Sequence, residues 1–197
     1  MRNPDLRFDE AAHAYYLGTR RLPSVTQILA QLQDWSKVDP VALEAARIRG
    51  THVHRMVELD VCGDLDEDTL APEYTGYLQQ WRKFRAEMQF KPLLCEQRVY
   101  HDVLGYAGTL DLLGMVGTHI YQVDIKTGVV PRTVGLQTAA YHEAGVRLGC
   151  VPPTAGRATL QLHDDGYKFR PIETAQAYDL ANFTAALNLH NWRLQNA

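Results

Sequence analysis

Two apolar stretches decide how this chain is read: Tyr106-Ala-Gly-Thr-Leu-Asp111 and Tyr121-Gln-Val-Asp124-Ile-Lys126-Thr-Gly128. Each carries a carboxylate, and the second places a lysine two residues after it. Between them, Gly117-Thr118 suits a two-residue turn with glycine first. We therefore predict two antiparallel strands, over residues 105–115 and 119–125.

A loop of two residues at 117–118 also fixes the register of these strands. Residue 116 then pairs with 119, so Asp111 lies opposite Asp124 with Cβ atoms about 5 Å apart. Lys126 follows two residues later and points to the same face. Opposed carboxylates repel, so either one takes up a proton at a raised pKa or a cation lies between them.

Carboxylate oxygens are hard ligands that favour Mg²⁺ or Mn²⁺, and magnesium binds substrate phosphates. Such a site is suited to phosphodiester cleavage by an activated water. Lys126 could orient or deprotonate that water, or stabilise the negative charge that develops. Asp-x-Lys alone also describes a surface ion pair at a strand end, so the prediction depends on the surrounding pattern.

A helix from residue 40 to about 61 adds to that pattern. Asp39-Pro40 is a strong helix start, with aspartate as the cap and proline in the first turn. One stripe of this helix, at spacings of three, four and four, contains Arg47, Gly50, His54 and Glu58. His54 could be a further metal ligand, and Glu58, which would not itself bind the metal, could orient the His54 side chain. The alternative is a His–Glu pair on the helix surface.

The remaining periodicity predicts a single α/β domain with a central mixed sheet flanked by helices. Residues 1–36 form an N-terminal β-hairpin (13–22) and a short helix (25–33), and residues 37–197 form the core. The other expected elements are a helix at 73–89, a strand at 93–101, a helix at 133–148, a hairpin at 157–163 and 167–171, and a helix at 173–194. The six acidic residues between Asp60 and Glu73 indicate a solvated loop.

Composition narrows the class of protein without choosing one. The chain has 197 residues, of which 46% are hydrophobic and 22% charged, as in an ordinary soluble protein. No apolar run reaches the length of a membrane span and the N-terminus has no apolar signal core, so we expect a cytoplasmic protein without a membrane partner. A net charge of −3 gives no global support for nucleic-acid binding, although a local basic face remains possible. The three scattered cysteines argue against a disulfide framework, a structural zinc site or an iron–sulfur cluster.

Taken in order, the motifs resemble those of a known superfamily. They are Arg49-Gly50-Thr51-x-x-His54-x-x-x-Glu58, Gly108-Thr-x-Asp111, Asp124-x-Lys126-Thr-Gly and Gln137-x-x-x-Tyr141. This series is similar to the PD-(D/E)xK nucleases, and specifically to the RecB-type exonuclease branch. The opening hairpin and the following Leu-Pro-Ser-Val-Thr-Gln-Ile-Leu resemble the phage-encoded and mitochondrial genome-maintenance exonucleases of that branch.

The resemblance implies a restriction-endonuclease-like core and a Mg²⁺ or Mn²⁺ site. Its ligands would be His54, Asp111, Asp124 and the backbone carbonyl of Ile125. Lys126 would be the catalytic lysine, and Glu96 would lie near the site. Asp124 stands where many relatives have glutamate. The cysteines that bind an iron–sulfur cluster in some relatives are missing, so no cluster is expected.

The same resemblance implies that Gln137 and Tyr141 line the site and position DNA or the lysine. Phosphates could be bound by Arg47, Arg49 and Arg132, which are equally able to be ordinary solvated side chains. Aromatic side chains near the N-terminus could stack on unpaired bases or pack in the core. These are Tyr15, Tyr16 and Trp35.

The sequence thus predicts a Mg²⁺- or Mn²⁺-dependent deoxyribonuclease that hydrolyses DNA from an end, in the host cytoplasm if it is encoded by a phage. Three alternatives remain open. The same core could be a structure-specific endonuclease, a catalytically inactive DNA-binding subunit, or a hydrolase of small phosphoesters.

Overall fold

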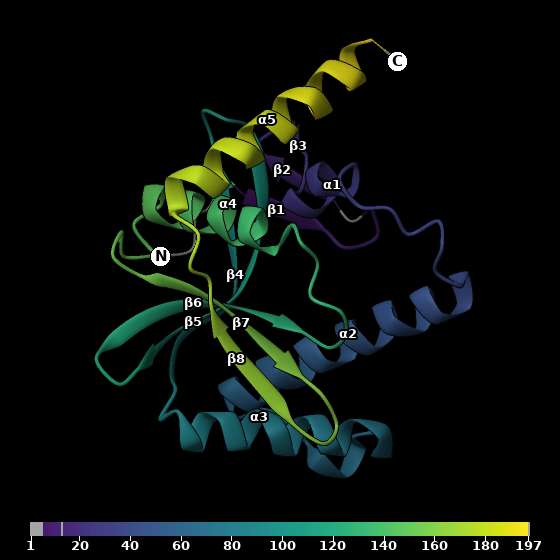
Figure 1. The fold of residues 1–197 in the computed structure, drawn as a ribbon, viewed down its shortest axis with the longest axis vertical. Helices are drawn as coiled ribbons and strands as arrows, with labels where there is room; N and C mark the ends of the chain where they lie inside the picture. Colours follow the sequence, from purple (N-terminus) through teal and green to yellow (C-terminus); the bar gives the residue numbers. More distant parts are fainter. Residues whose placement is uncertain (1–5, 13, 197) are drawn as a thin grey trace.

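The computed structural model describes residues 6–12 and 14–196. A five-stranded mixed sheet in the order β4-β5-β6-β7-β8 forms its centre (Figure 1). The strands are β4 (Lys91–His101), β5 (Tyr106–Val116), β6 (His119–Lys126), β7 (Gly156–Leu162) and β8 (Tyr167–Pro171). Only β6 and β7 pair in parallel, and helix α4 (Val134–Arg147) makes the crossover that a parallel pair requires. The predicted mixed sheet is confirmed.

Helices cover both faces of this sheet (Figure 1). On one face lie α1 (Val25–Ala30), α4 and α5 (Gln176–Gln195), and on the other lie α2 (Pro40–Cys62) and α3 (Thr75–Glu87). Two short 3₁₀ turns, Glu67–Thr69 and Pro72–Tyr74, lead into α3. No helix among residues 6–12 and 14–196 has the length and apolar character to cross a membrane.

The two faces bury separate hydrophobic clusters. Ile28 of α1, Ala144 of α4 and Phe183 of α5 meet the sheet on one side. Val53 of α2 and Trp81 of α3 pack with strand residues on the other. Burial of such side chains is the main source of stability for a sheet with two covered faces.

A second, three-stranded sheet precedes the core. It consists of β1 (Leu6–Asp9), β2 (Ala14–Leu17) and β3 (Arg20–Leu22). The β2–β3 pair confirms the predicted hairpin, whose expected first residue, 13, lies outside the described part of the chain. Strand β1 is an addition, since four residues are too few for a periodic signal. This sheet docks on β5 through Tyr15, Leu22 and Ala107.

Helix α2 begins where the sequence predicts, with the Asp39 side chain accepting a hydrogen bond from the Val41 amide. Its apolar residues are not all buried. Val41 and Ile48 are 76% and 41% exposed, because the N-terminal half of the helix projects beyond the sheet (Figure 1). The buried residues of α2, Val53, Met56 and Val57, all lie in its C-terminal half.

The expectation of a solvated acidic loop starting at Asp60 is wrong at its first residue. Asp60 belongs to the last turn of α2, and its side chain is only 7% exposed. Its carboxylate accepts a hydrogen bond of 2.7 Å from the indole of Trp81 and pairs with Arg85 at 3.0 Å and with Arg82. The carboxylate therefore joins the end of α2 to α3.

We predict that Asp60→Ala lowers the free energy of unfolding by about 2–4 kcal/mol, because it leaves the buried Trp81 N–H and the Arg85 charge without their partner. Urea denaturation measures this value. The control is Glu67→Ala, which removes an exposed partner of Arg82 and should change stability by less than about 1 kcal/mol. Equal losses in the two variants would contradict the proposed role of Asp60.

Candidate metal centre

The site is built where strands β5 and β6 part. Val116 pairs with His119, as the Gly117-Thr118 turn predicts, but the ladder ends at Leu112 and Val123, one step before Asp111 and Asp124. There the Asp111 carboxylate accepts a hydrogen bond of 2.7 Å from the Ile125 amide. A side chain thus replaces a backbone acceptor, which opens the edge of the ladder without leaving the buried N–H unsatisfied.

Glu96 comes from the neighbouring strand β4. The pairs Cys95–Leu112 and Gln97–Leu110 on either side of it place Glu96 across from Asp111. Its backbone is left-handed, with φ of 46°, which is uncommon for a residue other than glycine. Strained backbone of this kind is concentrated at functional sites.

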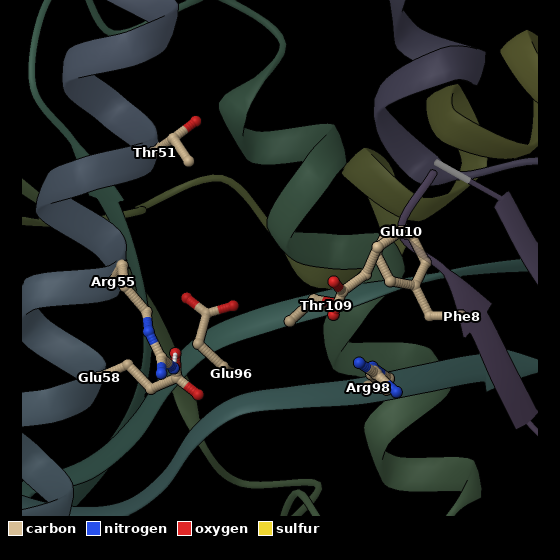
Figure 2. A pocket seen from close by; sticks show the side chains of 8 residues that line it. All are labelled: Phe8, Glu10, Thr51, Arg55, Glu58, Glu96, Arg98 and Thr109. Carbon is tan, nitrogen blue, oxygen red and sulfur yellow. Dashed lines mark hydrogen bonds and ion pairs between the residues drawn. The ribbon is translucent and has the colours of Figure 1, made fainter. Parts of the chain in front are cut away.

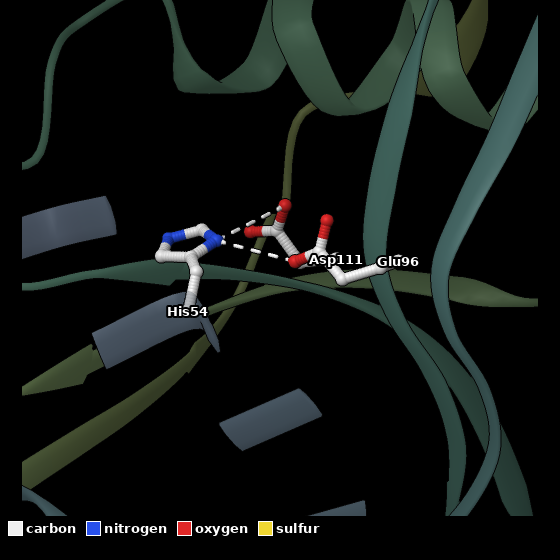
Figure 3. A group of neighbouring side chains, drawn as sticks. All are labelled: His54, Glu96 and Asp111. Carbon is white, nitrogen blue, oxygen red and sulfur yellow. Dashed lines mark ion pairs between the residues drawn. The ribbon is translucent and has the colours of Figure 1, made fainter. Parts of the chain in front are cut away.

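His54 reaches the site from α2. Its Nε2 lies 3.1 Å from the Ile125 carbonyl oxygen, 71 residues away in sequence. Its Nδ1 lies 3.5 Å from a Glu96 oxygen and 3.6 Å from an Asp111 oxygen (Figure 3). One ligand atom from each of these three residues falls within a mutual distance of 4.8 Å, which is the spacing of groups that can share a metal ion.

The charges in this cluster depend on one another. Burial lowers the pKa of His54, but the Asp111 and Glu96 carboxylates outweigh it and raise that pKa to about 9. Burial also raises the pKa of Asp111, which the charge on His54 opposes. The fold therefore holds the Asp111 and Glu96 carboxylates close together. The charged imidazole of His54 stabilises them.

Asp124 and Lys126 complete the site from β6. Asp124 is 2% exposed, and its Oδ2 lies 2.5 Å from Lys126 Nζ. Burial raises the pKa of Asp124 to about 6. Neither carboxylate oxygen has a hydrogen bond of ordinary geometry to the described residues. A carboxylate buried to this extent needs a positive charge beside it, and the Lys126 ammonium supplies one.

These residues fit a hard divalent cation. His54, Glu96 and Asp111 form the group whose ligand atoms lie close enough to share an ion, and the predicted ligand Asp124 is not in that group. The predicted Ile125 carbonyl lies beside His54 Nε2. Carboxylate and carbonyl oxygens are ligands that Mg²⁺ and Mn²⁺ favour. Neither a family model nor a curated protein matches the chain. Its function is therefore inferred from its residues and their geometry.

Helix α4 places two further predicted residues beside the lysine. Gln137 Oε1 lies 3.5 Å from Lys126 Nζ, and Gln137 Nε2 lies 3.5 Å from the Tyr141 hydroxyl. Both contacts are long for hydrogen bonds. A Cβ on Gly108 would overlap the Tyr141 ring, so the glycine of the Gly-Thr motif lets the tyrosine approach the sheet.

Two residues of the predicted α2 stripe are bound elsewhere. Glu58 pairs with Arg55 at 2.5 Å, and the carboxylate that contacts His54 is Glu96. The predicted orientation of His54 by Glu58 is therefore corrected to Glu96. Arg47 is likewise bound to Glu44, through two hydrogen bonds of 2.7 and 2.8 Å.

The other two predicted phosphate ligands lie in different places. Arg49 is half-buried beside Gly128, directly after Lys126-Thr, and its Nε has no hydrogen-bond partner among the described residues. Arg132 is exposed and borders a groove that Leu32 of the α1–α2 connection and Tyr178 of α5 also line. Arg49 is therefore the predicted arginine placed next to the candidate centre.

Tyr15 and Glu96 make contacts that the sequence pattern does not specify. Tyr15 is buried, as core packing requires, but its hydroxyl is 2.8 Å from the Thr109 hydroxyl, two residues before Asp111. Pairing the predicted strands 93–101 and 105–115 at their inner ends would set Glu96 opposite Leu110. The structure pairs His101 with Tyr106, and this shift of one residue sets Glu96 opposite Asp111.

Replacing Glu96 separates backbone strain from ligand binding. We predict that Glu96→Gly has a free energy of unfolding about 1 kcal/mol higher than Glu96→Ala, because only glycine adopts φ of 46° without a Cβ clash. Both variants should lose Mn²⁺ affinity to the same extent, since both lack the carboxylate. Urea denaturation and titration calorimetry measure the two quantities. Equal stabilities would show that the backbone at residue 96 is not strained.

Proposed function

We propose that the chain is a Mg²⁺- or Mn²⁺-dependent deoxyribonuclease that hydrolyses phosphodiester bonds in DNA. The observation that carries the proposal is the meeting of His54 from α2, Glu96 from β4 and Asp111 from β5 in one group. The Asp124–Lys126 pair lies on β6, just beyond the end of the β5–β6 ladder at Leu112 and Val123. Residues on α2 and on the β4–β5 strand pair, which are far apart in the sequence, thus meet in one group.

The metal would be held by Asp111, Asp124, His54 and the Ile125 carbonyl, with Glu96 as a further carboxylate. When bound, it would neutralise charge on the scissile phosphate and lower the pKa of a water. The protein holds these oxygens in place before a substrate arrives, through the Asp111–Ile125 hydrogen bond and the Glu96–His54 contact.

Lys126 is suited to stabilising negative charge. Burial lowers its pKa, but the Asp124 and Asp111 carboxylates outweigh burial and raise it. The ammonium is therefore charged at neutral pH and can donate to an oxygen of the phosphate as charge develops there. A charged ammonium supports stabilisation of the developing charge, or orientation of the water, over removal of a proton from that water.

Residues around the lysine would position the substrate. Gln137 and Tyr141 border Lys126 on the α4 side, and Arg49 can offer its guanidinium to a neighbouring phosphate. The resemblance to RecB-type exonucleases supports attack from a DNA end. We also propose a cytoplasmic location, in the host cell if the protein is encoded by a phage.

Lys126→Ala tests the mechanism. We expect the cleavage rate of end-labelled DNA in Mg²⁺ to fall by at least about 100-fold, as for removal of a group that stabilises the transition state. The control is Lys168→Ala, which removes an exposed lysine from the distant edge strand β8 and should cleave at the wild-type rate. Circular dichroism shows whether both variants are folded. A folded Lys126→Ala protein with full activity would disprove the mechanism.

A closed circular DNA decides between the two nuclease modes. An exonuclease leaves the circle intact while it degrades the same DNA after linearisation, and this is the result we expect. Cleavage of the circle would identify an endonuclease. A protein that binds DNA but neither binds Mn²⁺ nor cleaves would be the inactive subunit.

A further inference from the structure

Helix α5 has an outward face that carries no charge. Its inward side packs against α1 and α4 through Phe183 and Leu187. The opposite side is exposed, and helical spacing places seven of its residues on one face. They are Tyr178, Ala181, Asn182, Ala185, Asn188, Leu189 and Trp192. None of the seven is acidic or basic, although charged residues make up about a quarter of an ordinary protein.

Three large apolar side chains of this face are open to water. Tyr178 is 65% exposed, Trp192 60% and Leu189 41%. The C-terminal end of α5 also extends past the other elements of the fold (Figure 1). An exposed apolar surface of this kind marks an interaction site, and helical turns that pack on nothing are only marginally stable in water. We therefore expect a partner to cover this face.

A groove of about 580 Å³ lies along the same face. Its apolar lining residues, apart from Tyr178, are Leu32, Leu136, Ala185, Ala186 and Leu189. Of the charged residues that line it, Arg132 is exposed and Asp179 is paired with the buried Arg157 at 2.9 Å. The pocket beside the candidate metal centre differs, because three glutamates and two arginines line it (Figure 2). The groove on α5 is thus suited to an apolar side chain of a protein partner.

The pattern of side chains along the face is similar when it is read from either end. Ala185 is at the centre, with an aromatic residue seven positions away on each side, Tyr178 and Trp192. Two copies of α5 packed antiparallel about a twofold axis at Ala185 would bring Tyr178 of each copy against Trp192 of the other. A twofold interface joins one surface patch to the same patch on a second copy, so it needs a face that matches its own reverse.

The positions between the centre and the ends match as well. Four positions from Ala185 are Ala181 and Leu189, a small and a large apolar side chain. Three positions from it are Asn182 and Asn188. The Asn182 amide donates to the Tyr178 carbonyl oxygen at 2.9 Å, so its own side-chain oxygen is left to accept from Asn188 of the other copy. Antiparallel packing also sets the positive N-terminal end of each helix beside the negative C-terminal end of its partner.

We propose that two copies of the chain associate through this face of α5, antiparallel about a twofold axis at Ala185. A face without cations does not attract a phosphate backbone, and an unrelated protein would not require a face that matches its own reverse. The interface goes beyond the proposed deoxyribonuclease function and does not depend on it, since none of the seven residues belongs to the candidate metal centre.

Sedimentation of the full chain over a range of concentrations tests the association. We expect the average mass to rise toward twice the 22.3 kDa of one chain. Ala185→Arg should raise the Kd of the dimer at least about 100-fold, because it sets two like charges against each other at the axis. The control is Val103→Arg, which changes a residue that is 70% exposed in the β4–β5 turn and should leave the Kd unchanged. Circular dichroism shows whether both variants are folded.

Crosslinking tests the orientation of the two helices. It uses Cys62→Ser protein, because Cys62 is an exposed free cysteine. A short bismaleimide should join two copies of Ala185→Cys, since residue 185 meets itself at the axis. Leu189→Cys is the matched control, because its two copies would lie about 12 Å apart along the helices and should not be joined. Mixing Leu189→Cys with Ala181→Cys should give a crosslink, since these two positions face each other.

Three results would overturn the assignment: a protein that stays monomeric at every concentration, a dimer that Ala185→Arg does not weaken, or equal dissociation by Val103→Arg. Self-crosslinking of Leu189→Cys as readily as Ala185→Cys would contradict the antiparallel arrangement. Failure of the proposed function looks different. A protein that forms this dimer and cleaves no DNA would support the interface and contradict the nuclease.

Discussion

The hydrogen bond from the Ile125 amide to the Asp111 carboxylate is the constraint on which the site depends. Strands that separate inside a protein leave backbone groups without partners, and a buried N–H in that state is costly. Asp111 supplies the missing acceptor from a side chain. The separated strands expose the Ile125 carbonyl to His54 and leave Asp124 and Lys126 at a buried edge.

Electrostatics follow from that arrangement. Glu96, Asp111 and Asp124 are brought together by backbone pairing, which takes no account of their repulsion. The cost is offset by two cationic side chains from the same neighbourhood, His54 and Lys126. Because burial weakens solvent screening, these charges act on one another strongly.

Much of this could be predicted because it depends on local rules. The Gly117-Thr118 turn fixed the β5–β6 register, and the Asp39-Pro40 cap fixed the start of α2. The position of His54 followed from helical spacing. Helical spacing could not identify the carboxylate that contacts His54. It compares only residues on one helix, and therefore favoured Glu58 over Glu96. A left-handed residue within a strand gives no periodic signal, and the exposure of Val41 depends on what lies opposite the helix.

Assembly order is a further consequence of taking ligands from α2 and from the sheet. The β4–β5–β6 meander joins strands through short turns, whereas His54 must close a long loop to reach Ile125. Loop closure makes such distant contacts slow to form. We therefore expect the meander to fold first and the docking of α2 to complete the centre. A newly made or partly unfolded chain would hold its carboxylates in place before it had the histidine, and the group of His54, Glu96 and Asp111 would be complete only once the helix had docked.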